Sequence, residues 1–336
     1  MPSPNVPTTA RAPEARAEEL ASRLTAAISE RKRMLVIVNP YATTVSDRLR
    51  NLVVYALQSR YDVEAVDTER RDHATQICRE AAGEGYDVVV AFGGDGTVNE
   101  AANGLIGSDT PLSCLPGGAT NVFHRTLGIP GDVVDATEHL LGMADDFRPR
   151  KVDLGLVNGR AFVFSSGVGL DASVVERVDA HPRLKARLGE YYYTWAAIST
   201  FNKRYLVRPP QMRVTVDGST LDAVTVVAQN SDPFTYFGSR PIRVCEGAGL
   251  ETGSLGVAAL RKATVLELPT LIPRLFSGRA TTVSKHRQIE PFPDVHEALV
   301  ESADGRPLPV QVDGDYIGEH QSVLYSAAPA ALTVVS

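Results

Sequence analysis

The chain has few cysteines and no long apolar stretch. Its three cysteines, Cys78, Cys114 and Cys245, lie far apart and lack the spacing of metal ligands. This sparse use of cysteine fits a reducing, cytosolic setting in which the thiols are buried rather than paired. No apolar run reaches the length of a membrane span, and the first residues lack the apolar core of a signal peptide. We therefore expect a cytoplasmic protein without a transmembrane segment.

The chain has fewer basic than acidic residues. Lys and Arg number 34 while Asp and Glu number 40, so the formal net charge is −6. This acidic balance does not suggest a nucleic-acid partner. The hydrophobic content of 43% and the charged content of 22% are typical of a globular protein with a sizeable core, and 336 residues favour two domains.

The glycine-rich segment at residues 93–97, Gly-Gly-Asp-Gly-Thr, is neither a Walker loop nor the dinucleotide fingerprint. It follows an apolar run, Val88–Phe92, that is typical of a strand buried on both faces of a parallel sheet. Thr97 is a candidate helix N-cap, and Glu100 three residues later would complete a capping box. A strand, a glycine loop and a helix start make an anion site, because free backbone N–H groups and the helix dipole point the same way.

The acid within this loop, Asp95, indicates which kind of anion is bound. A carboxylate would repel phosphate unless a divalent cation lay between them, and Mg²⁺ commonly binds one or two carboxylates together with substrate phosphates. We therefore interpret the loop as a site for a nucleotide polyphosphate with Mg²⁺. The alternative is a tight turn with a surface Asp, which the position between a strand and a helix disfavours.

The first 150 residues alternate between predicted strands and helices. Strands are expected at 34–38, 61–66, 88–92 and 112–115, and helices at 45–59, at 72–83, in a stretch reaching residue 127, and at 132–143. The alternation predicts right-handed βαβ units and a parallel sheet, in which ligands bind at the carboxyl ends of the strands. Four segments fall at such ends: Asn39, Thr68, the 93–97 loop and the 116–121 loop.

The pattern changes after about residue 150, where short strands and polar turns predominate. A hairpin is predicted at 152–165 around Asn158-Gly159, and further strands at 212–216, 221–228, 254–260, 280–284, 298–302, 308–312 and 322–326. One helix is expected at about 182–203. This pattern predicts an antiparallel β-sandwich. The expected organisation is a flexible tail over 1–33 with a polar helix at 14–31, an α/β nucleotide-binding domain over 34–150, and a β-sandwich domain over 151–336.

Four motifs taken together resemble one family. They are Asn39-Pro40, the segment from Gly93 to Glu100, the segment from Pro116 to Arg125, and Val312-Asp313-Gly314-Asp315. In this order they resemble the diacylglycerol kinase catalytic-domain family of bacterial lipid kinases, which also includes sphingosine and ceramide kinases. The resemblance runs from about residue 33 to the end. The glycine motif alone is shared with NAD kinases and phosphofructokinases, so by itself it implies only that superfamily.

The resemblance implies ATP- and Mg²⁺-dependent phosphorylation of a lipid hydroxyl, with diacylglycerol as the expected substrate and phosphatidic acid as the product. It implies that Asp313 is the general base, that Asp95 takes part in catalysis, and that Asp95 and Asp315 bind the metal. A carboxylate within hydrogen-bond reach of the hydroxyl can take its proton as the new P–O bond forms. The last segment is expected to return to the first domain. The residues that the resemblance places around the nucleotide are Asn39, Thr68, Gly93, Gly94, Asp95, Gly96, Thr97, Glu100, Gly118, Thr120, Asn121 and Asp315.

Three positions depart from the family pattern. Val122 stands where the family has an Asp that is a candidate for contacting the substrate head group, so the identity of the substrate is open. Glu251-Thr252 replaces a pair of acids, and we expect the family's second Mg²⁺ site to be weak or absent. Asp315 stands where the family usually has Glu and is one methylene shorter. The alternative for Asp313-Gly314 is a plain hairpin turn like the one expected at Asp217-Gly218.

Residues 177–213 carry eight Lys or Arg against two acids, together with six aromatic residues. This combination is typical of docking to an anionic membrane surface, and a solvated helix packed on the sandwich is an equal alternative. The expected partners are therefore ATP and a lipid at the membrane surface, with a homodimer left open.

Two other functions stay open beside the lipid kinase. The first is an NAD kinase or other small-molecule kinase that uses the same glycine loop. The second is a nucleotide-binding regulator without catalysis, which the altered second loop and Thr252 favour and which Asp95 and Asp313 disfavour.

Overall fold

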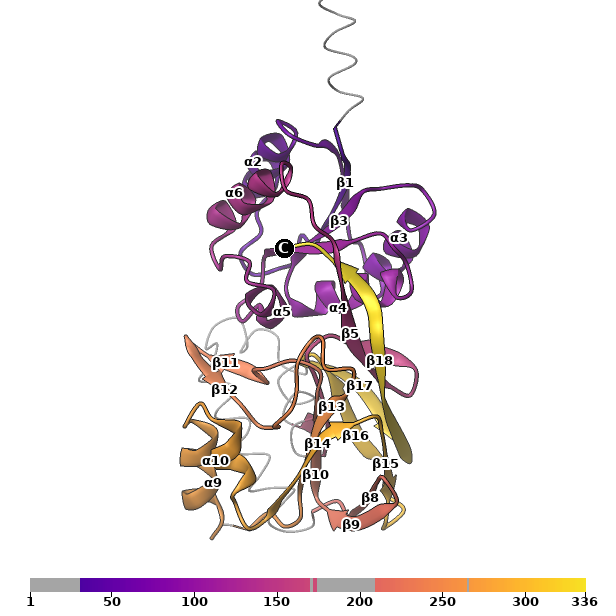
Figure 1. The fold of residues 1–336 in the computed structure, drawn as a ribbon, viewed down its shortest axis with the longest axis vertical. Helices are drawn as coiled ribbons and strands as arrows, with labels where there is room; N and C mark the ends of the chain where they lie inside the picture. Colours follow the sequence, from indigo (N-terminus) through magenta and orange to yellow (C-terminus); the bar gives the residue numbers. More distant parts are fainter. Residues whose placement is uncertain (1–30, 170–171, 174–208, 265) are drawn as a thin grey trace, which may run out of the picture.

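The computed structural model describes residues 31–169, 172–173, 209–264 and 266–336. Its N-terminal part contains parallel strands in the order β2-β1-β3-β4. The strands are β1 (Arg33–Val38), β2 (Asp62–Asp67), β3 (Val88–Gly93) and β4 (Leu112–Pro116). The helices are α2 (Asp47–Leu57), α3 (His73–Ala81), α4 (Asp95–Leu105), α5 (Val122–Thr126) and α6 (Val133–Met143). Figure 1 shows α2 and α6 on one side of these strands and α3 and α4 on the other.

The central strand β3 shows why this sheet forms where the sequence predicts it. All six of its residues are buried, and β1 and β4 pair with it on either side. Strand β1 buries five of its six residues. A strand covered by helices on both faces needs apolar residues at every position rather than at alternate ones. The predicted parallel α/β sheet is confirmed.

The C-terminal region is an antiparallel β-sandwich. One of its sheets has the strand order β14-β13-β10-β7-β16-β17, and the facing strands are β15, β8, β9, β5 and β6 with β18. Between the sheets lies a core of small branched side chains and two rings, Phe162 and Tyr325, whose centroids are 6.1 Å apart in an edge-to-face arrangement. The predicted sandwich is confirmed.

The elements of this region have the following bounds. The first strands are β5 (Arg150–Val157), β6 (Arg160–Phe162), β7 (Ser165–Gly169), β8 (Met212–Val216), β9 (Ser219–Ala223), β10 (Thr225–Gln229), β11 (Thr235–Phe237) and β12 (Arg240–Ile242). The later strands are β13 (Leu255–Leu260), β14 (Ile289–Val295), β15 (Glu297–Ser302), β16 (Leu308–Val312), β17 (Asp315–His320) and β18 (Ser322–Val334). The helices are α9 (Leu268–Leu275) and α10 (Ala280–Ser284).

The last strand, β18, joins the two parts of the molecule. It is 13 residues long, pairs antiparallel with β15 and β5, and reaches β4, where Val334 lies opposite Leu112 in a parallel pair. The Gly107 N–H also donates to the Ala331 carbonyl at 2.8 Å. One ten-stranded sheet therefore runs from the parallel part into the sandwich (Figure 1).

Two predictions about strands are wrong. Residues 280–284 form helix α10: the run of Thr and Val favours a strand, but only Val283 is buried, and Arg274 of α9 donates to the Thr282 carbonyl at 2.8 Å. The single strand predicted over 221–228 is divided at Val224. There the chain leaves β8 of one sheet and pairs with β7 and β13 of the other.

The sequence pattern does not predict strand β14, because prolines interrupt it. Strand β14 contains Pro291 and Pro293 and lies at the edge of its sheet, which is where a strand tolerates proline. The helices predicted at 14–31 and 182–203 and the basic stretch at 177–213 fall, except for a few terminal residues, outside the described residues. In the part of the chain that the structure describes, no helix has the length and apolar character needed to cross a bilayer.

Candidate active site

The carboxyl ends of the parallel strands bring together the segments predicted as a ligand site. Asn39, directly after β1, donates from Nδ2 to the Thr97 hydroxyl at 3.1 Å. The Thr68 N–H, after β2, donates to the last carbonyl of β1 at 2.8 Å. The Gly117 N–H, after β4, donates to the Gly93 carbonyl at 2.8 Å. Loops from all of these strands therefore meet at one edge of the sheet, where α/β proteins bind ligands.

The two glycine-rich loops pack backbone against backbone. A Cβ added at Gly117 would lie 2.8 Å from the Gly93 Cα, and a Cβ added at Gly118 would lie 2.8 Å from the Gly94 Cα. Real Cβ atoms do not approach a backbone this closely. These glycines are therefore needed for the contact between the loops, before any ligand is considered.

Gly117→Ala is expected to lower the free energy of unfolding by about 1–3 kcal/mol, because the added methyl would meet backbone atoms that cannot rotate away. Urea denaturation measures the change. The matched control is Gly142→Ala in α6, where an added Cβ has nothing within 4 Å. Helix propensity predicts that this control gains about 0.5–1 kcal/mol. Equal effects at the two glycines would contradict the close contact of the loops.

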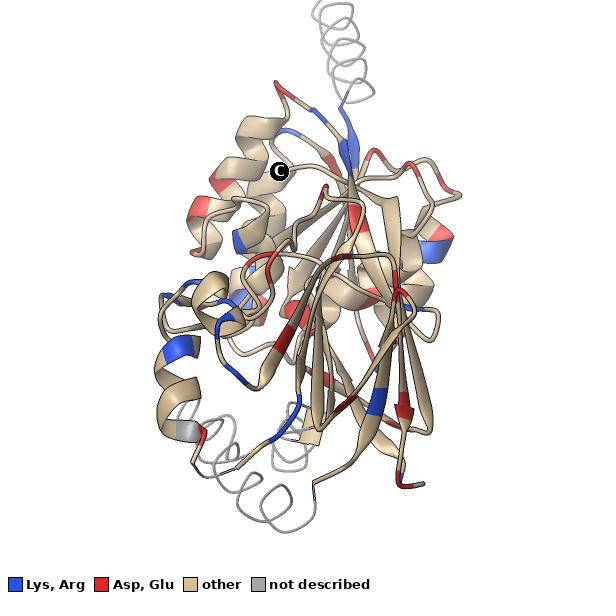
Figure 2. Cartoon of the chain, turned by 60° about the horizontal axis from the view of Figure 1, so that its bottom comes forward, with Lys and Arg blue, Asp and Glu red and all other residues tan. Residues whose placement is uncertain are grey.

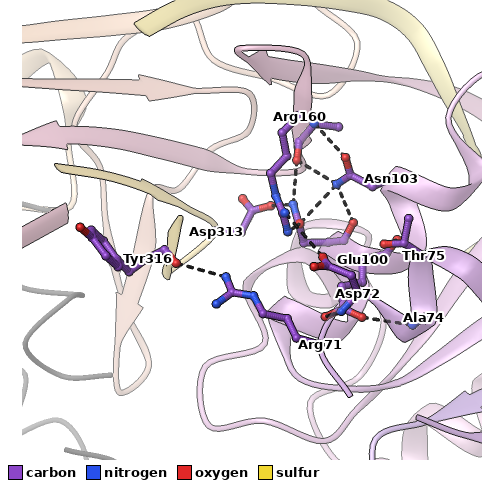
Figure 3. A network of polar contacts seen from close by, with 11 residues as sticks. Arg71, Asp72, Ala74, Thr75, Glu100, Asn103, Arg160, Asp313 and Tyr316 are labelled. Carbon is purple, nitrogen blue, oxygen red and sulfur yellow. Dashed lines mark hydrogen bonds and ion pairs between the residues drawn. The ribbon is translucent and has the colours of Figure 1, made fainter. Parts of the chain in front are cut away.

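Helix α4 begins earlier than the sequence predicts. Its N-cap is Gly94, so the predicted capping box between Thr97 and Glu100 is wrong. Both side chains have other partners: Thr97 binds Asn39, and the Glu100 carboxylate accepts from the N–H groups of Asp72 at 2.9 Å and of Ala74 at 3.1 Å. Glu100 therefore caps the start of the neighbouring helix α3 (Figure 3). Its role as a nucleotide ligand stays a prediction, and both of its oxygens are already engaged.

The second loop is closed by Asn121. This residue has a φ of 47°, and its side chain accepts from the Gly118 N–H at 2.8 Å and donates to the Gly118 carbonyl at 2.7 Å. The short polar side chain of Asn tolerates this left-handed conformation. Thr120 lies inside the closed turn and is partly exposed, and its contact with a nucleotide stays a prediction.

Three carboxylates converge beside the first glycine loop. Asp95 opens α4, while Asp313 and Asp315 flank the tight turn between β16 and β17. A Cβ at Gly96 would lie 2.6 Å from Asp315 Oδ2, so this carboxylate rests against the helix start. Burial first, and then the negative charges of Asp313 and Asp315, raise the pKa of Asp95 to about 7, although the Phe123 N–H opposes the shift.

Such a set of acids fits a divalent cation that is completed by a ligand. Within the described ranges, no group of three His, Cys, Asp or Glu side chains lies close enough together to hold a metal ion. Mg²⁺ commonly binds through one or two carboxylates and completes its shell with water and substrate phosphates. Burial is the main cause of the raised pKa of Asp95, and a bound cation would offset the smaller contribution from the charges of Asp313 and Asp315.

Asp313 is fixed by four hydrogen bonds. Its Oδ2 accepts from Asn99 Nδ2 and from the Val163 N–H, both at 2.7 Å. Its Oδ1 accepts from the N–H groups of Phe164 at 2.9 Å and of Ser165 at 3.0 Å. The side chain is 3% exposed, and burial raises its pKa to about 6 although the four donors lower it. Asp313 therefore links α4 to the segment that leads into β7.

Asn99 was not predicted as a site residue. Its Nδ2 also donates to the Ala161 carbonyl at 2.9 Å, and its side chain is 2% exposed. Asn103, one turn later, donates to the same carbonyl at 3.0 Å and accepts from the Ala161 N–H at 2.9 Å (Figure 3). The sequence held one signal for this pair: two Asn residues four apart share one face of a helix.

Comparison with known proteins agrees with this fold. Residues 33–157 match the diacylglycerol kinase catalytic domain, and residues 164–336 match the YegS C-terminal NAD kinase beta sandwich-like domain. The chain belongs to the diacylglycerol kinase family. Relatives in this family are named diacylglycerol kinases.

Individual relatives are distant. A diacylglycerol kinase of Bacillus subtilis (strain 168) is 32% identical over 193 residues, which cover 56% of this chain and 60% of that protein. Diacylglycerol kinases of Staphylococcus aureus are 26% identical over 297 residues, covering 86% of this chain and 88% of the relative. An uncharacterised Synechocystis protein is 26% identical over 300 residues, 84% of this chain and 65% of that protein. The chain thus spans less than two thirds of two of these relatives.

The fold has a similar solved counterpart. A crystal structure of a Bacillus anthracis (strain Sterne) protein assigned as a diacylglycerol kinase has a TM-score of 0.70 and 25% sequence identity. The match covers 90% of this chain and 95% of that chain. The α/β part and the sandwich therefore occur together in this family.

Val122, where the family resemblance implies an Asp, lies at the acid site. It is the first residue of α5 and is 1% exposed. The N–H of the next residue, Phe123, donates to Asp95 Oδ1 at 3.3 Å, so position 122 lies beside the acids. An Asp here, as in the family pattern, would add a further negative charge next to Asp95. With the apolar Val122, this part of the site lacks that negative charge.

The loop at Glu251-Thr252 is held by groups of the chain itself. Glu251 pairs with Arg150, and the Thr252 hydroxyl lies 3.0 Å from the carbonyl oxygens of both Gly249 and Ser254. Asp153 accepts from the Gly253 N–H at 2.6 Å. The carboxylate and carbonyl oxygens that could bind a cation here therefore have internal partners.

EDTA is expected to leave the Tm of the nucleotide-free Asp315→Asn variant unchanged, because the oxygen atoms of this loop already have partners within the chain. Differential scanning fluorimetry measures the Tm with EDTA and with excess Mg²⁺. The Asp315→Asn background removes one candidate ligand of the catalytic ion, so that a remaining effect of the metal points to another site. A fall of several degrees in EDTA would show that a structural ion persists.

Proposed function

We propose that the protein is an ATP- and Mg²⁺-dependent kinase that transfers the γ-phosphoryl group of ATP to the hydroxyl of diacylglycerol, giving phosphatidic acid. The observation that supports this most directly is the convergence of Asp95, Asp313 and Asp315 between the first glycine loop and the sandwich. The choice of acceptor rests on the relatives that are named diacylglycerol kinases.

The start of α4 is suited to binding the nucleotide phosphates. The first turn of a helix leaves backbone N–H groups without intrahelical partners, and the helix dipole adds positive potential there. Asn39 and Thr97 stand beside this turn and are joined by a hydrogen bond. Mg²⁺, when bound by Asp315 and the phosphates, supplies positive charge that offsets the charge on the transferring group.

Asp95 is better suited than Asp313 to accept the proton of the lipid hydroxyl. All four in-plane acceptor positions of Asp313 are filled by N–H groups of the protein. Asp95 has fewer donors, the N–H groups of Phe123 at 3.3 Å and of Val122, and its pKa is raised to about 7. A carboxylate with such a pKa is a competent base near neutral pH. Since coordination to Mg²⁺ would lower its basicity, we assign proton acceptance to Asp95 and metal binding to Asp315.

In the proposed reaction, the hydroxyl oxygen of the lipid attacks the γ-phosphorus while its proton passes to Asp95. The bond between the γ-phosphorus and the bridging oxygen breaks, and ADP leaves with both electrons of that bond. Asp313 holds the segment 163–165 against α4 and so fixes the sandwich relative to the helix that carries Asp95.

The test incubates the protein with labelled ATP, Mg²⁺ and mixed micelles that contain diacylglycerol, ceramide, sphingosine or monoacylglycerol, with NAD as a soluble acceptor. Label in diacylglycerol that disappears in the Asp95→Asn variant is the expected result. Label in another lipid would change the substrate, and label in NAD alone would replace the lipid kinase by a small-molecule kinase. Binding of ATP without transfer to any acceptor would favour a regulator without catalysis.

A further inference from the structure

An apolar surface lies on α9 and the adjoining β11–β12 hairpin. The exposed fractions are 39% for Phe237, 83% for Leu266, 45% for Ile272 and 44% for Phe276. Ile272 and Phe276 are four residues apart and share one face of α9 and its end, and the rings of Phe237 and Phe276 meet edge to face at 5.5 Å. We call these four residues the α9 apolar surface. Single exposed apolar residues are common, whereas several on one helix, its ends and an adjoining hairpin are typical of an interaction site.

The chain around this surface is basic although the whole protein is acidic. Residues 261–288 contain six Lys or Arg and a single acid, in a chain with a net charge of −6. That acid, Glu267, is 6% exposed and paired with Arg287, so it does not face solvent as a free charge. The exposed basic residues here include Lys262, Arg279 and Lys285. Figure 2 shows Lys and Arg on and near α9, along the same edge of the molecule.

The hairpin connects this surface to the candidate active site. The Arg125 guanidinium of α5 lies 4.6 Å from the centre of the Tyr236 ring and donates to the Gly238 carbonyl at 3.3 Å. The same short helix supplies the Phe123 N–H to Asp95. The β11–β12 hairpin and helix α5 therefore connect the α9 apolar surface to Asp95.

We propose that the α9 apolar surface docks the protein onto an anionic lipid bilayer, with the exposed apolar side chains entering the interface and the surrounding cations contacting the head groups. Exposed apolar side chains with Lys and Arg nearby complement the apolar and the anionic layers of such a membrane. The inference rests on the proposed function, because a lipid whose acyl chains stay in the bilayer must present its hydroxyl close to the membrane surface. Docking through α9 brings the hairpin, and with it α5, to that surface.

The test is flotation of the full-length protein with vesicles, without nucleotide, so that it does not depend on catalysis. Wild type is expected to float with phosphatidylcholine vesicles containing phosphatidylglycerol and much less with phosphatidylcholine alone, and high salt is expected to weaken the binding. The double variant Phe237→Ser/Phe276→Ser is expected to lose roughly tenfold or more in partition coefficient. Arg279→Gln and Lys285→Gln are each expected to lose roughly fivefold on the anionic vesicles.

The matched control is Leu52→Ser/Tyr55→Ser on α2, where the two apolar side chains are 58% and 78% exposed. This variant is expected to float like wild type. Circular dichroism and thermal unfolding check that each variant is folded.

Flotation of the Phe237→Ser/Phe276→Ser variant at the wild-type level, or no flotation of wild type, would overturn the proposal. A wild-type dimer that this variant converts to a monomer would make the surface a contact between two copies and would also overturn it. Vesicle binding without kinase activity would leave the docking inference standing and remove the proposed function.

Discussion

Replacing Asp95 with Asn is expected to lower kcat by roughly 10²–10⁴-fold, the usual contribution of a positioned general base. The amide has nearly the same shape as the carboxylate and can still accept from the Phe123 N–H, so the fold should persist. Initial rates at saturating ATP and diacylglycerol in mixed micelles measure the effect. The matched control is Asp222→Asn, an exposed acid on β9, which is expected to retain the wild-type rate.

The Mg²⁺ dependence of the same variant separates the two roles predicted for Asp95. If Asp95 accepts the proton, excess Mg²⁺ does not restore the rate of Asp95→Asn, whereas Asp315→Asn needs more Mg²⁺ for half-maximal activity. Recovery of Asp95→Asn at high Mg²⁺ would make Asp95 a metal ligand instead. If the kcat of Asp95→Asn stays within tenfold of the wild-type value, another group must be the general base.

The raised pKa of Asp95 also has a consequence for stability. Folding raises this pKa from 3.8 to about 7, so between these values the folded protein holds a proton that the unfolded chain releases. In EDTA and without nucleotide, the stability of wild type relative to Asp95→Asn is expected to be highest below about pH 4 and to fall as the pH rises through about 7. Urea titrations at a series of pH values measure this, and a rise with pH would contradict it.

The parts of the site that the sequence predicts are those that local rules determine. An apolar run followed by Gly93 and Gly94 predicts a buried strand and a loop, and the rule that parallel strands share one ligand edge then places Asn39 and Thr68 beside that loop. The partner of Asn99 could not be found in this way. Asp313 lies 214 residues away, and no local pattern joins the two.

Glu100 shows the same limit at shorter range. Its position three residues after Thr97 satisfies the pattern of a capping box, yet it caps α3 instead. The choice depends on how closely α3 and α4 approach. A Cβ at Gly104 would lie 2.5 Å from the Cys78 Cβ, so glycine allows the two helices to come together and brings Glu100 to the start of α3. The distance between α3 and α4 cannot be predicted from the sequence of either helix alone.

Asp313→Asn is expected to lower the free energy of unfolding by about 3–5 kcal/mol, because a buried and fully hydrogen-bonded charge is removed while its donors remain. An amide keeps one acceptor oxygen and turns an NH₂ group toward two of the four N–H donors, whichever way it is rotated. Urea denaturation measures the loss. Activity assayed at low temperature, where the variant is still folded, then reports on catalysis separately from stability.

The chain provides a closely matched control in Asp217→Asn. Asp217 has a φ of 48° and Asp313 a φ of 49°, and each is followed by Gly in a hairpin turn, but Asp217 is exposed. Asn tolerates this conformation, so the control is expected to change stability by less than about 0.5 kcal/mol. A large loss at Asp313 alone would show that its carboxylate joins the two parts of the molecule. A stable but inactive Asp313→Asn variant would instead support the general base that the family resemblance implies, and the filled acceptor positions of Asp313 would then have to open during the reaction.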